Sequence, residues 1–503
     1  MSLVVGIDVG TQSVKLIAYD PALHRVQALY GQAIDLIADD TGGREQRPEW
    51  WIDAIRACFA RLDPALRARV VGIGVSGQQH GFVPLDATGK VIAPAKLWCD
   101  TSTQAECEEI MHAVGGAQQC MELAGNPILT GYTAPKLPWT RKHRPDVYAQ
   151  LACILLPHDY VNFWLTGERW MEYGDASGTG WLDVRTRQWS KALLAATDAQ
   201  RNLSSCLPPL VGPDASFPLS PVIAEELGLP RNVRVSAGGG DNMMAAIGTG
   251  NVSTGMLSMS LGTSGTLFAH AMHPVVDSAG RWAAFCSSSG GWLPLICTMN
   301  CTVATEAVAT AFGFSTHEGD AIMAGTTPGA SGLVMLPFFN GERTPDLPYA
   351  RASLFGLEPG NFDRANVYRA AMEGATYALR NGYDLLQAAG MHFDAIRLTG
   401  GGSHSAAWRQ MVADVFALPV EIPAQTEGAA LGAALQALWA IEKSTNPDAD
   451  FAAIVREHVQ LDAGLATYPD TRAVAAHQPS YQRFLRHLDD ARNLHAEHLP
   501  THG

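Results

Sequence analysis

The sequence has no cluster of basic residues, no long apolar run and little charge of either sign. Lys and Arg number 35 against 49 Asp and Glu, so the net charge is −14 at pH 7. A chain this acidic lacks the positive patches that nucleic acids and anionic membrane surfaces require. We therefore expect no nucleic-acid partner and no membrane partner. Any bound polyphosphate must be held by backbone N–H groups, a metal ion or a single cation.

No apolar stretch reaches the length of about 20 residues that a membrane-spanning helix needs. The closest, 428–441, is short and contains Gln436. The apolar run at the start has no basic flank and is interrupted by Asp8, so it does not resemble a secretion signal. Nine cysteines at irregular spacing are typical of reduced thiols, and we expect a cytoplasmic protein.

The most informative feature present is a pair of short Gly-Thr turns, Gly10-Thr11 and Gly262-Thr263, which lie 252 positions apart in 503 residues. Apolar and β-branched residues flank each turn on both sides, a pattern that predicts strand, tight turn and strand. In such a turn, backbone N–H groups and a Thr hydroxyl can converge on one phosphate.

Only the first turn is preceded by an acid, because Asp8 stands where the second half has Ser260. This asymmetry suggests a duplicated fold that holds one nucleotide between its halves, with a metal-bound phosphate facing the first half. Two ordinary β-hairpins are the simpler explanation for either turn alone. The repetition at a half-chain interval favours the phosphate site.

Strand-like and helix-like stretches alternate in both halves, which predicts an α/β protein with a mixed sheet in each half. We expect two domains, 1–250 and 251–503, and a helical, amphipathic tail from about 451. In the tail, Tyr481, Phe484, Leu485 and Leu488 share one face. A helix with a small-residue face is expected after Glu427, where close packing is a better explanation than function.

Asp241 follows a strand at 233–237 and three glycines, and it precedes a predicted helix at 242–247. Asp is a favoured helix N-cap, so a purely structural role is one explanation. The other is that the glycines expose its carboxylate at the carboxyl end of the strand, where α/β proteins bind ligands. There it could accept the proton of a hydroxyl that attacks a phosphate. The sequence leaves both explanations open.

Two further glycine-containing loops follow predicted strands. Gln79 and His80 lie in the loop 76–81, whose neutral amide and imidazole groups suit an uncharged, polyhydroxylated ligand. Gly400-Gly401-Gly402 precedes a predicted helix at 406–416 and offers flat backbone and a helix N-terminus to a nucleotide. Each loop could also be an ordinary structural turn.

Two long segments carry a resemblance to a known family. Residues 131–143, which contain Lys136 and Trp139, and residues 352–373 are similar to the two signatures of the FGGY family of carbohydrate kinases. The resemblance covers nearly the whole chain, and Thr140 departs from it where an apolar residue is usual. It implies two duplicated actin-like (ribonuclease H-type) ATPase domains with a cleft between them. The implied activity is phosphorylation of a sugar with ATP and Mg²⁺.

Within the family, the loop 76–81 looks like that of members that convert D-xylulose to D-xylulose 5-phosphate. Two residues depart from the family pattern. Ser102 stands where Arg is common, and His404 stands where Lys or Arg is common. Another ketopentose such as D-ribulose, or a polyol, is the alternative substrate. A chaperone-type ATPase of the same fold is less favoured, because about 60 residues after the second half are too few for a further domain. A homodimer is compatible with the resemblance.

The resemblance also implies roles for single residues. On the sugar side these are the general base Asp241 and the sugar contacts Asn242, Gln79 and His80. On the ATP side they are the Mg²⁺-holding acid Asp8, the phosphate turns at Thr11 and Thr263, and the adenosine contacts Gly401, Gly402 and Ser405. The protein is thereby expected to use a small-molecule sugar and ATP as its partners.

Overall fold

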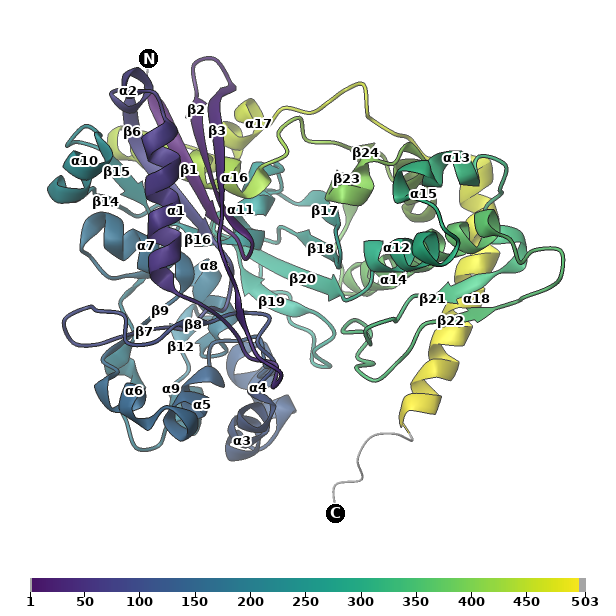
Figure 1. The fold of residues 1–503 in the computed structure, drawn as a ribbon, viewed down its shortest axis with the longest axis horizontal. Helices are drawn as coiled ribbons and strands as arrows, with labels where there is room; N and C mark the ends of the chain where they lie inside the picture. Colours follow the sequence, from purple (N-terminus) through teal and green to yellow (C-terminus); the bar gives the residue numbers. More distant parts are fainter. Residues whose placement is uncertain (1, 497–503) are drawn as a thin grey trace. The chain divides into compact units, whose positions relative to one another are not determined.

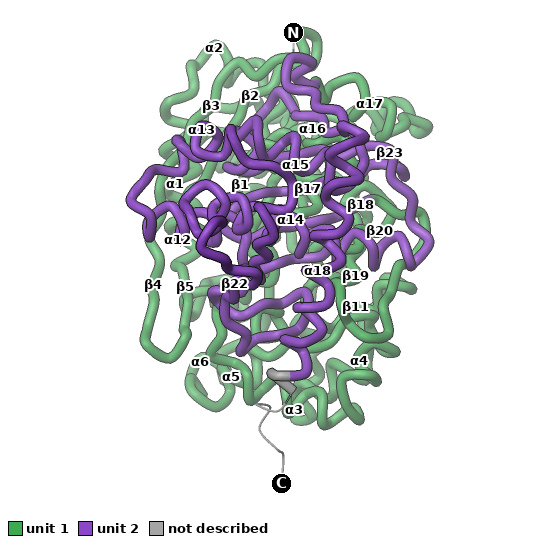
Figure 2. Tube along the Cα trace, turned by 90° about the vertical axis from the view of Figure 1, so that its right-hand side faces the viewer, with its two compact units in different colours: residues 1–253, 270–294, 427–460 green, residues 254–269, 295–426, 461–503 purple. Residues whose placement is uncertain are grey.

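The computed structural model describes residues 2–496, which form two compact units (Figures 1 and 2). Unit 1 consists of Met1–Ser253, His270–Pro294 and Glu427–Gln460. Unit 2 consists of Thr254–Ala269, Leu295–Thr426 and Leu461–Gly503. Among the described residues, no helix is long and apolar enough to cross a membrane.

The main sheet of unit 1 has a central parallel part and an antiparallel edge. Its order is β14-β15-β6-β1-β2-β3, and β16 also pairs with β6. These strands are β1 (Leu3–Val9), β2 (Ser13–Asp20), β3 (Arg25–Ala33), β6 (Val70–Gly77), β14 (Ser216–Pro218), β15 (Arg234–Ser236) and β16 (Gly239–Gly240). β1, β15 and β16 run parallel to β6, whereas β2 is antiparallel to both β1 and β3.

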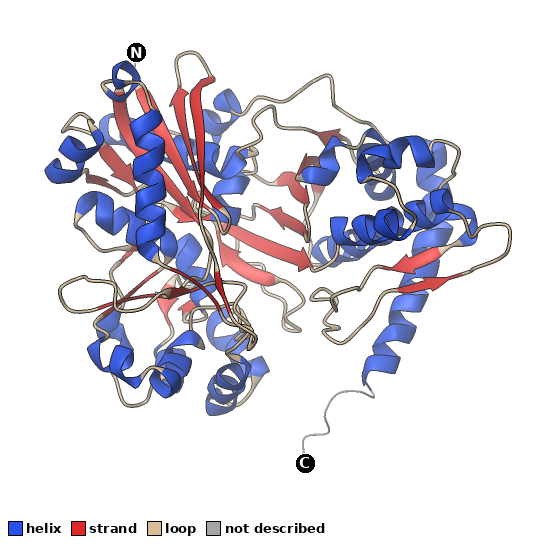
Figure 3. Ribbon diagram, viewed as in Figure 1, coloured by secondary structure: helices blue, strands red, loops and turns tan. Residues whose placement is uncertain are grey.

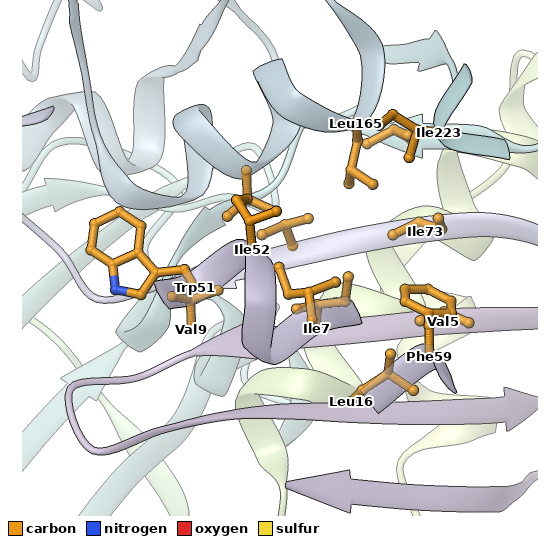
Figure 4. Packing of buried hydrophobic residues seen from close by; sticks show 14 of the residues in the cluster. Val5, Ile7, Val9, Leu16, Trp51, Ile52, Phe59, Ile73, Leu165 and Ile223 are labelled. Atoms are coloured by element: carbon orange, nitrogen blue, oxygen red, sulfur yellow. The ribbon is translucent and has the colours of Figure 1, made fainter. Parts of the chain in front are cut away.

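Helices cover both faces of this sheet, which is why the central strand β1 is apolar on both sides. On one face, Val5, Ile7 and Val9 pack with Trp51 and Phe59 of α1 (Pro48–Arg61) (Figure 4). The helices α7 (Pro157–Thr166) and α10 (Pro221–Leu227) also contribute to this core. The other face is covered by α11 (Asp241–Gly248), α16 (Gly428–Thr445) and α17 (Phe451–His458).

Helix α16 approaches the backbone of the sheet very closely. A Cβ atom added to Gly6 of β1 would lie 1.8 Å from the Ala430 carbonyl oxygen, and one added to Gly74 of β6 would lie 1.9 Å from that of Ala433. Only glycine allows this contact. The close packing expected for the small-residue face of this helix is therefore confirmed.

The main sheet of unit 2 repeats the plan of unit 1. Its strands follow the order β19 (Ala283–Cys286)-β20-β18-β17-β23-β24. The other strands are β17 (Gly255–Leu261), β18 (Gly265–Ala269), β20 (Trp292–Thr298), β23 (Phe393–Thr399) and β24 (Val420–Glu421). As in unit 1, the first strand pairs antiparallel with the second and parallel with a later one.

A shared irregularity supports the duplication. The parallel register shifts between Leu3 and Val4 in unit 1 and between Gly255 and Met256 in unit 2. These positions are again 252 apart, the interval between the two Gly-Thr turns. Both predicted strand–turn–strand units are confirmed, as β1–β2 and β17–β18.

The remaining helices and strands of each unit are drawn in Figure 3. In unit 1 they are β4 (Ile37–Ala38), β5 (Arg44–Gln46), α2 (Pro64–Arg67), β7 (Val83–Leu85), β8 (Ala95–Lys96), α3 (Gln104–Val114), α4 (Ala117–Ala124), α5 (Lys136–His143), α6 (Pro145–Gln150), β9 (Cys153–Leu155), β10 (Met171–Glu172), α8 (Tyr173–Ala176), η1 (Ser177–Thr179), β11 (Leu182–Asp183), β12 (Gln188–Trp189), α9 (Lys191–Thr197), η2 (Leu203–Cys206) and β13 (Leu210–Val211). In unit 2 they are α12 (Thr302–Ala311), η3 (Thr316–Glu318), α13 (Gly319–Met323), η4 (Ala330–Gly332), β21 (Val334–Leu336), β22 (Ser353–Phe355), α14 (Arg364–Ala388), η5 (Gly401–His404), α15 (Ala406–Phe416) and α18 (Thr471–Ala496).

The C-terminal region is not one helical tail, as the sequence had suggested. Helices α17 and α18 are separate, and the residues between them form extended structure. There the Thr467 backbone pairs with Val420, with N···O distances of 2.9 and 2.8 Å. These hydrogen bonds take the place of helical ones. The predicted apolar face of α18 is correct, since Tyr481, Phe484 and Leu488 are buried.

The sequence division at residue 250 lies close to Ser253, where the first segment of unit 1 ends. The chain then crosses between the units more often than one boundary implies. Residues 270–294 and 427–460, both expected in the second half, belong to unit 1. Helices α16 and α17 thus complete the unit that contains β1.

Candidate active site in unit 1

Three parallel strands of unit 1 end at one edge of the sheet. In the strand register, Asp8 of β1 lies beside Ser76 of β6, and Ser76 lies beside Gly239 of β16. The loop after β6 carries Gln79 and His80, and the chain after β16 enters α11 at Asp241. Parallel pairing therefore brings together predicted site residues from three distant parts of the sequence.

Asp8 is held by one neighbour and desolvated by the rest of the site. The Ser76 hydroxyl donates a hydrogen bond to Asp8 Oδ1 at 2.7 Å. Burial raises the pKa of Asp8 above its usual range, against the opposing effects of Ser76 and Lys15. Lys15 is itself paired with Glu427, with Nζ 2.6 Å from Oε2. The result is a carboxylate that a cation would stabilise.

Asp241 is the first residue of α11, not its N-cap. The N-cap is Gly240, and no side chain caps this helix. Asp241 Oδ1 instead accepts hydrogen bonds from the next residue, Asn242, from its backbone N at 2.8 Å and from Nδ2 at 3.1 Å. The structural explanation from the sequence, that this aspartate caps the helix, is therefore wrong.

The environment of Asp241 favours its neutral form. Desolvation raises its pKa to about 8, and the charges of Asp8 and Asp175 act in the same direction. The residue as a whole is half-buried. A carboxyl group whose pKa lies close to neutral pH is suited to proton transfer.

Gln79 and Asn242 form a pair beside Asp241. Asn242 Nδ2 donates a hydrogen bond to Gln79 Oε1 at 2.8 Å. Gln79 is almost completely buried, and its Nε2 has no hydrogen-bond partner of good geometry. These amides, predicted from the loop and from the turn after β16, lie together as expected for a site that binds hydroxyl groups.

His80 is fixed through both its backbone and its ring. Its φ of 64° lies in the left-handed region, which is unfavourable for a residue with a bulky side chain. The His80 carbonyl accepts hydrogen bonds from Lys136 Nζ at 2.6 Å and Thr133 Oγ1 at 3.1 Å. Since a carbonyl oxygen only accepts, His80 Nδ1 must donate to Gly178 O at 2.7 Å. In the neutral ring Nε2 is then the acceptor.

Two aromatic side chains lie beside the His80 ring. The ring centroids of Tyr132 and Phe285 lie 4.8 and 5.7 Å from that of His80. On the other side, a Cβ atom on Gly178 would lie 2.4 Å from His80 Nδ1. Only glycine fits at position 178, because any larger side chain would displace the His80 imidazole.

The first Gly-Thr turn uses its hydroxyl group internally. Thr11 Oγ1 donates to Gln78 Oε1 at 3.1 Å and accepts from Trp98 Nε1 at 2.9 Å. Because its one hydroxyl proton is engaged, a phosphate at this turn would meet backbone N–H groups. The hydroxyl contribution expected from the sequence is not available in this conformation.

In unit 2, the second Gly-Thr turn and the glycine run lie at the ends of neighbouring strands. Ser260 of β17 pairs with Thr399 of β23, directly before Thr263 and the run 400–402. A Cβ atom on Gly401 would meet nothing within 4 Å, whereas Gly402 packs against Leu261 and Trp408. Of the two glycines predicted to contact adenosine, Gly401 has the open side.

Ser405 has a structural role in the folded unit. Its hydroxyl accepts a hydrogen bond from Trp408 N at 2.9 Å and caps α15. The same hydroxyl donates to Asp320. Both hydrogen bonds lie within the protein, so the position predicted for adenosine binding is also a helix N-cap.

The structure accounts for two of the three departures from the family pattern. Ser102 Oγ donates to Asp100 Oδ1 at 2.6 Å and accepts from Lys96 Nζ at 3.1 Å. Lys96 is thus the cation that pairs with Asp100. Thr140 Oγ1 donates to the Lys136 carbonyl at 2.7 Å, which satisfies its hydroxyl in a buried position. His404 is exposed at the end of η5.

Several site residues had no role assigned from the sequence, namely Ser76, Thr133, Lys136, His158, Asp175 and Phe285. Their signal was weak, because each acts on the backbone or side chain of a residue distant in sequence. Lys136 lies in the segment 131–143, which resembles a family signature. The motif alone does not show that Lys136 acts on the carbonyl of His80.

Comparisons with known proteins show the family to which the chain belongs. Residues 3–248 match the N-terminal domain, and residues 257–441 the C-terminal domain, of the FGGY family of carbohydrate kinases. A xylulose kinase from Haemophilus influenzae is 42% identical over 492 residues, covering 96% of this chain and 99% of the relative. A xylulose kinase from Streptomyces coelicolor is 36% identical over 495 residues, covering 98% and 97%.

Solved structures show the same fold. The crystal structure of a kinase from Brucella ovis, described as a xyloylose kinase, is 32% identical. It has a TM-score of 0.91 and covers 98% of this chain and 100% of its own. The expected two-domain α/β kinase fold is confirmed. Two family domains and relatives matched over nearly their full length establish that the chain belongs to the FGGY family of carbohydrate kinases.

Proposed function

We propose that this carbohydrate kinase phosphorylates D-xylulose to D-xylulose 5-phosphate with ATP. The observation that carries the proposal is the arrangement of Asp241 beside the paired amides of Gln79 and Asn242. It combines a proton acceptor with neutral groups for sugar hydroxyls. The xylulose kinases of Haemophilus influenzae and Streptomyces coelicolor, similar over nearly the whole chain, support the choice of sugar.

In this proposal Asp241 is the general base. A sugar hydroxyl hydrogen-bonded to its carboxylate attacks the γ-phosphate of ATP, and Asp241 takes the hydroxyl proton. Because phosphoryl transfer has a loose transition state, orientation of the hydroxyl matters more than its early deprotonation. The raised pKa of Asp241 makes it a better proton acceptor than an ordinary aspartate once it is ionised.

Gln79, His80 and Asn242 bind the sugar. The acceptor nitrogen of His80 and the amide groups can exchange hydrogen bonds with hydroxyl and carbonyl groups. Tyr132 and Phe285 beside His80 supply apolar surface for the carbon side of the sugar. An uncharged ligand suits this lining better than a phosphorylated one, which calls for Arg.

Asp8 is the residue that would hold Mg²⁺. Mg²⁺ in phosphoryl-transfer sites keeps several waters and is bound by one or two carboxylates together with substrate phosphates. A partly desolvated carboxylate at the end of a strand, held on one oxygen only by Ser76, fits that requirement. Among the described residues, no group of three or more His, Cys, Asp or Glu could hold a metal, which agrees with a site completed by phosphate and water. When bound, the ion would neutralise phosphate charge.

The nucleotide contacts remain those expected from the sequence. Gly401, Gly402 and the backbone of Ser405 are assigned to the adenosine side, because the Ser405 hydroxyl is already bonded to Trp408 N and Asp320. The turns at Thr11 and Thr263 are assigned to phosphate groups. The open side of Gly401 supports its assignment. For Thr11, the engaged hydroxyl restricts the proposed contact to the backbone.

ATP turnover with a panel of sugars tests the proposal. The purified protein should turn over ATP with D-xylulose at a higher kcat/KM than with D-ribulose, L-xylulose, xylitol or glycerol. The product should show phosphorus coupling at C5 by NMR. A higher kcat/KM for another member of the panel would replace the substrate and leave the kinase assignment intact. Sugar-independent ATP hydrolysis would favour the chaperone-type alternative.

We further propose a cytoplasmic location. All nine cysteines are free thiols, and seven of them are buried. A reducing compartment would preserve them. The predicted homodimer is a separate proposal, which sedimentation velocity of the purified protein would decide.

A further inference from the structure

A buried charged cluster lies directly beneath the candidate sugar site in unit 1. His158, on the first turn of α7, lies between two aspartates: Nδ1 is 2.7 Å from Asp175 Oδ2, and Nε2 is 2.9 Å from Asp159 Oδ1. All three side chains are essentially inaccessible to solvent. The proposed mechanism gives none of them a role.

The cluster is costly as a purely structural element. Burial disfavours a charged imidazole, yet the two aspartates outweigh this effect and raise the pKa of His158 to about 10. The ring is therefore a cation at neutral pH. It lies at a helix N-terminus, where the helix dipole disfavours positive charge. Well-packed apolar residues would hold α7 in place at least as well.

The position of Asp175 links the cluster to the active site. A Cβ atom added to Gly240, the residue before Asp241, would lie 2.9 Å from Asp175 Oδ1 and 2.6 Å from Gln79 Cγ. Asp175 and Gln79 thus pack against the same backbone position. Burial raises the pKa of Asp175, whereas its hydrogen bond to His158, the charge of His158 and the Gln79 amide oppose this effect and stabilise the carboxylate. Asp175 Oδ1 and Gln79 Nε2 are both buried and have no hydrogen-bond partner of good geometry.

The ionisation of Asp175 decides how the Gln79 amide is oriented. A carboxylate can only accept hydrogen bonds, so Gln79 must turn its NH₂ group toward Asp175. Its Oε1 then accepts from Asn242 Nδ2, as observed at 2.8 Å. Asn242 Nδ2 in turn donates to Asp241 Oδ1. A chain of oriented groups thus runs from the buried imidazolium to the proposed base.

Other charged groups face the cluster without replacing it. Glu172 is buried nearby, accepts hydrogen bonds from Ser288 Oγ at 2.7 Å and Asp175 N at 3.2 Å, and is stabilised by the charge of His158. The negative charge of Asp175 contributes to the raised pKa of Asp241. His158 is the group of this cluster that carries positive charge.

We infer that His158 and Asp175 are positioning residues of the sugar site: the imidazolium keeps Asp175 an acceptor, and Asp175 sets the orientation of the Gln79 and Asn242 amides toward the sugar. This inference rests on the proposed sugar-kinase function. It assigns neither residue to contact with the reacting atoms.

The kinetic test compares three substitutions of similar size. Asp175→Asn and His158→Gln should each raise the KM for the sugar about tenfold, equivalent to ~1.4 kcal/mol, and leave the KM for ATP unchanged. Asp159→Asn is the matched control, because it removes the other carboxylate from the same imidazole and does not touch Gln79. It should lower the thermal midpoint and leave both KM values close to wild type.

A double-mutant cycle separates positioning from general damage. In a Gln79→Ala background, Asp175→Asn should change the sugar KM less than twofold, because the amide it orients is gone. The inference is overturned if the effect persists there, or if Asp159→Asn raises the sugar KM as much as Asp175→Asn does.

A readout without any substrate keeps the inference separate from the proposed function. In a crystal structure of the unliganded Asp175→Asn protein, the Gln79 amide should be flipped or occupy two orientations. An unchanged Gln79–Asn242 hydrogen bond would overturn the inference whichever sugar is phosphorylated. Absence of pentulose turnover in the wild-type protein would instead count against the proposed function alone.

Discussion

Lys136 Nζ donates a 2.6 Å hydrogen bond to the backbone carbonyl of His80, the residue that holds a left-handed φ in the proposed sugar-binding loop. A second hydrogen bond ties the same ammonium group to Gly131 O at 2.8 Å. Burial lowers the pKa of this lysine to about 7. A buried lysine Nζ that donates to the backbone oxygens of both His80 and Gly131 is suited to holding a loop conformation.

Lys136→Met should weaken sugar binding without changing the chemistry of phosphoryl transfer. Loss of a charge-assisted hydrogen bond costs about 1.5–3 kcal/mol, so the sugar KM should rise roughly 10- to 150-fold. Lys142→Met is the control, because Lys142 lies on the same helix and pairs only with Glu106 and Glu109. If both substitutions had equal effects on the sugar KM, Lys136 would not be acting through His80.

Asp241→Asn should remove most turnover. Loss of a general base typically lowers the rate by about 10² to 10⁴-fold, and Asn preserves the size of the side chain. Sugar and ATP binding, measured by calorimetry, should remain detectable. A variant that binds both ligands and keeps more than a tenth of the wild-type kcat would exclude Asp241 as the base.

The same substitution should make the protein less sensitive to rising pH. Asp241 titrates near pH 8 when folded and near 3.8 when unfolded. Between these values unfolding releases a proton, so this group lowers the free energy of unfolding as pH rises. The contribution is about 1.4 kcal/mol per pH unit at most. Thermal midpoints measured from pH 5 to 8 should therefore fall more steeply for wild type than for Asp241→Asn. Parallel curves would mean that the carboxyl is already ionised at pH 5.

His80→Ala should weaken sugar binding and spare the nucleotide. The lost hydrogen bond is worth about 1.5–3 kcal/mol or less, and ATP affinity measured by calorimetry should barely change. Tyr148→Phe is the control for a general loss of stability, because it removes a hydroxyl of unit 1 that donates a hydrogen bond to Asp198. An equal loss of ATP affinity in His80→Ala would contradict a sugar-binding role.

Ser405→Ala should affect stability more than nucleotide binding. Removing a helix N-cap costs about 1 kcal/mol, and the hydroxyl is already bonded to Trp408 N and Asp320. The thermal midpoint should fall while the KM for ATP changes less than twofold. A large rise in that KM with unchanged stability would show that Ser405 contacts the nucleotide, as the family resemblance implies.

Local patterns predicted the strands and turns well, because alternation and glycine act within a few residues. The turns at Gly10 and Gly262, and the helix that begins at Ala406, lie where the sequence indicated. The clustering of Asp8, Gln79 and Asp241 followed from the ends of parallel strands. The orientation of these groups could not be predicted. His80 is fixed by Lys136 and Gly178, which lie 56 and 98 positions away in the sequence. Gln79 is influenced by Asp175 through an electrostatic interaction in the buried interior.

The tail was harder to predict than the sheets. Residues 459–470 are amphipathic enough to suggest a continuous helix, but Thr467 pairs with Val420 in extended structure. The membership of α16 in unit 1 was also out of reach. Its small residues indicated close packing, and the sequence does not identify Gly6 and Gly74 as the partners.

The packing of α16 against the first sheet has a consequence for biosynthesis. Gln436 of this helix accepts a hydrogen bond from Gly238 N at 2.9 Å and so secures the turn that leads to Asp241. Gly238 precedes Gln436 by 198 residues. At about 5 to 20 residues per second, a ribosome makes Gln436 roughly 10 to 40 s after that turn. The candidate site edge is therefore secured only after Gln436 has been made, and a truncated product ending at 253 would contain the edge residues without the α16 contacts that hold them.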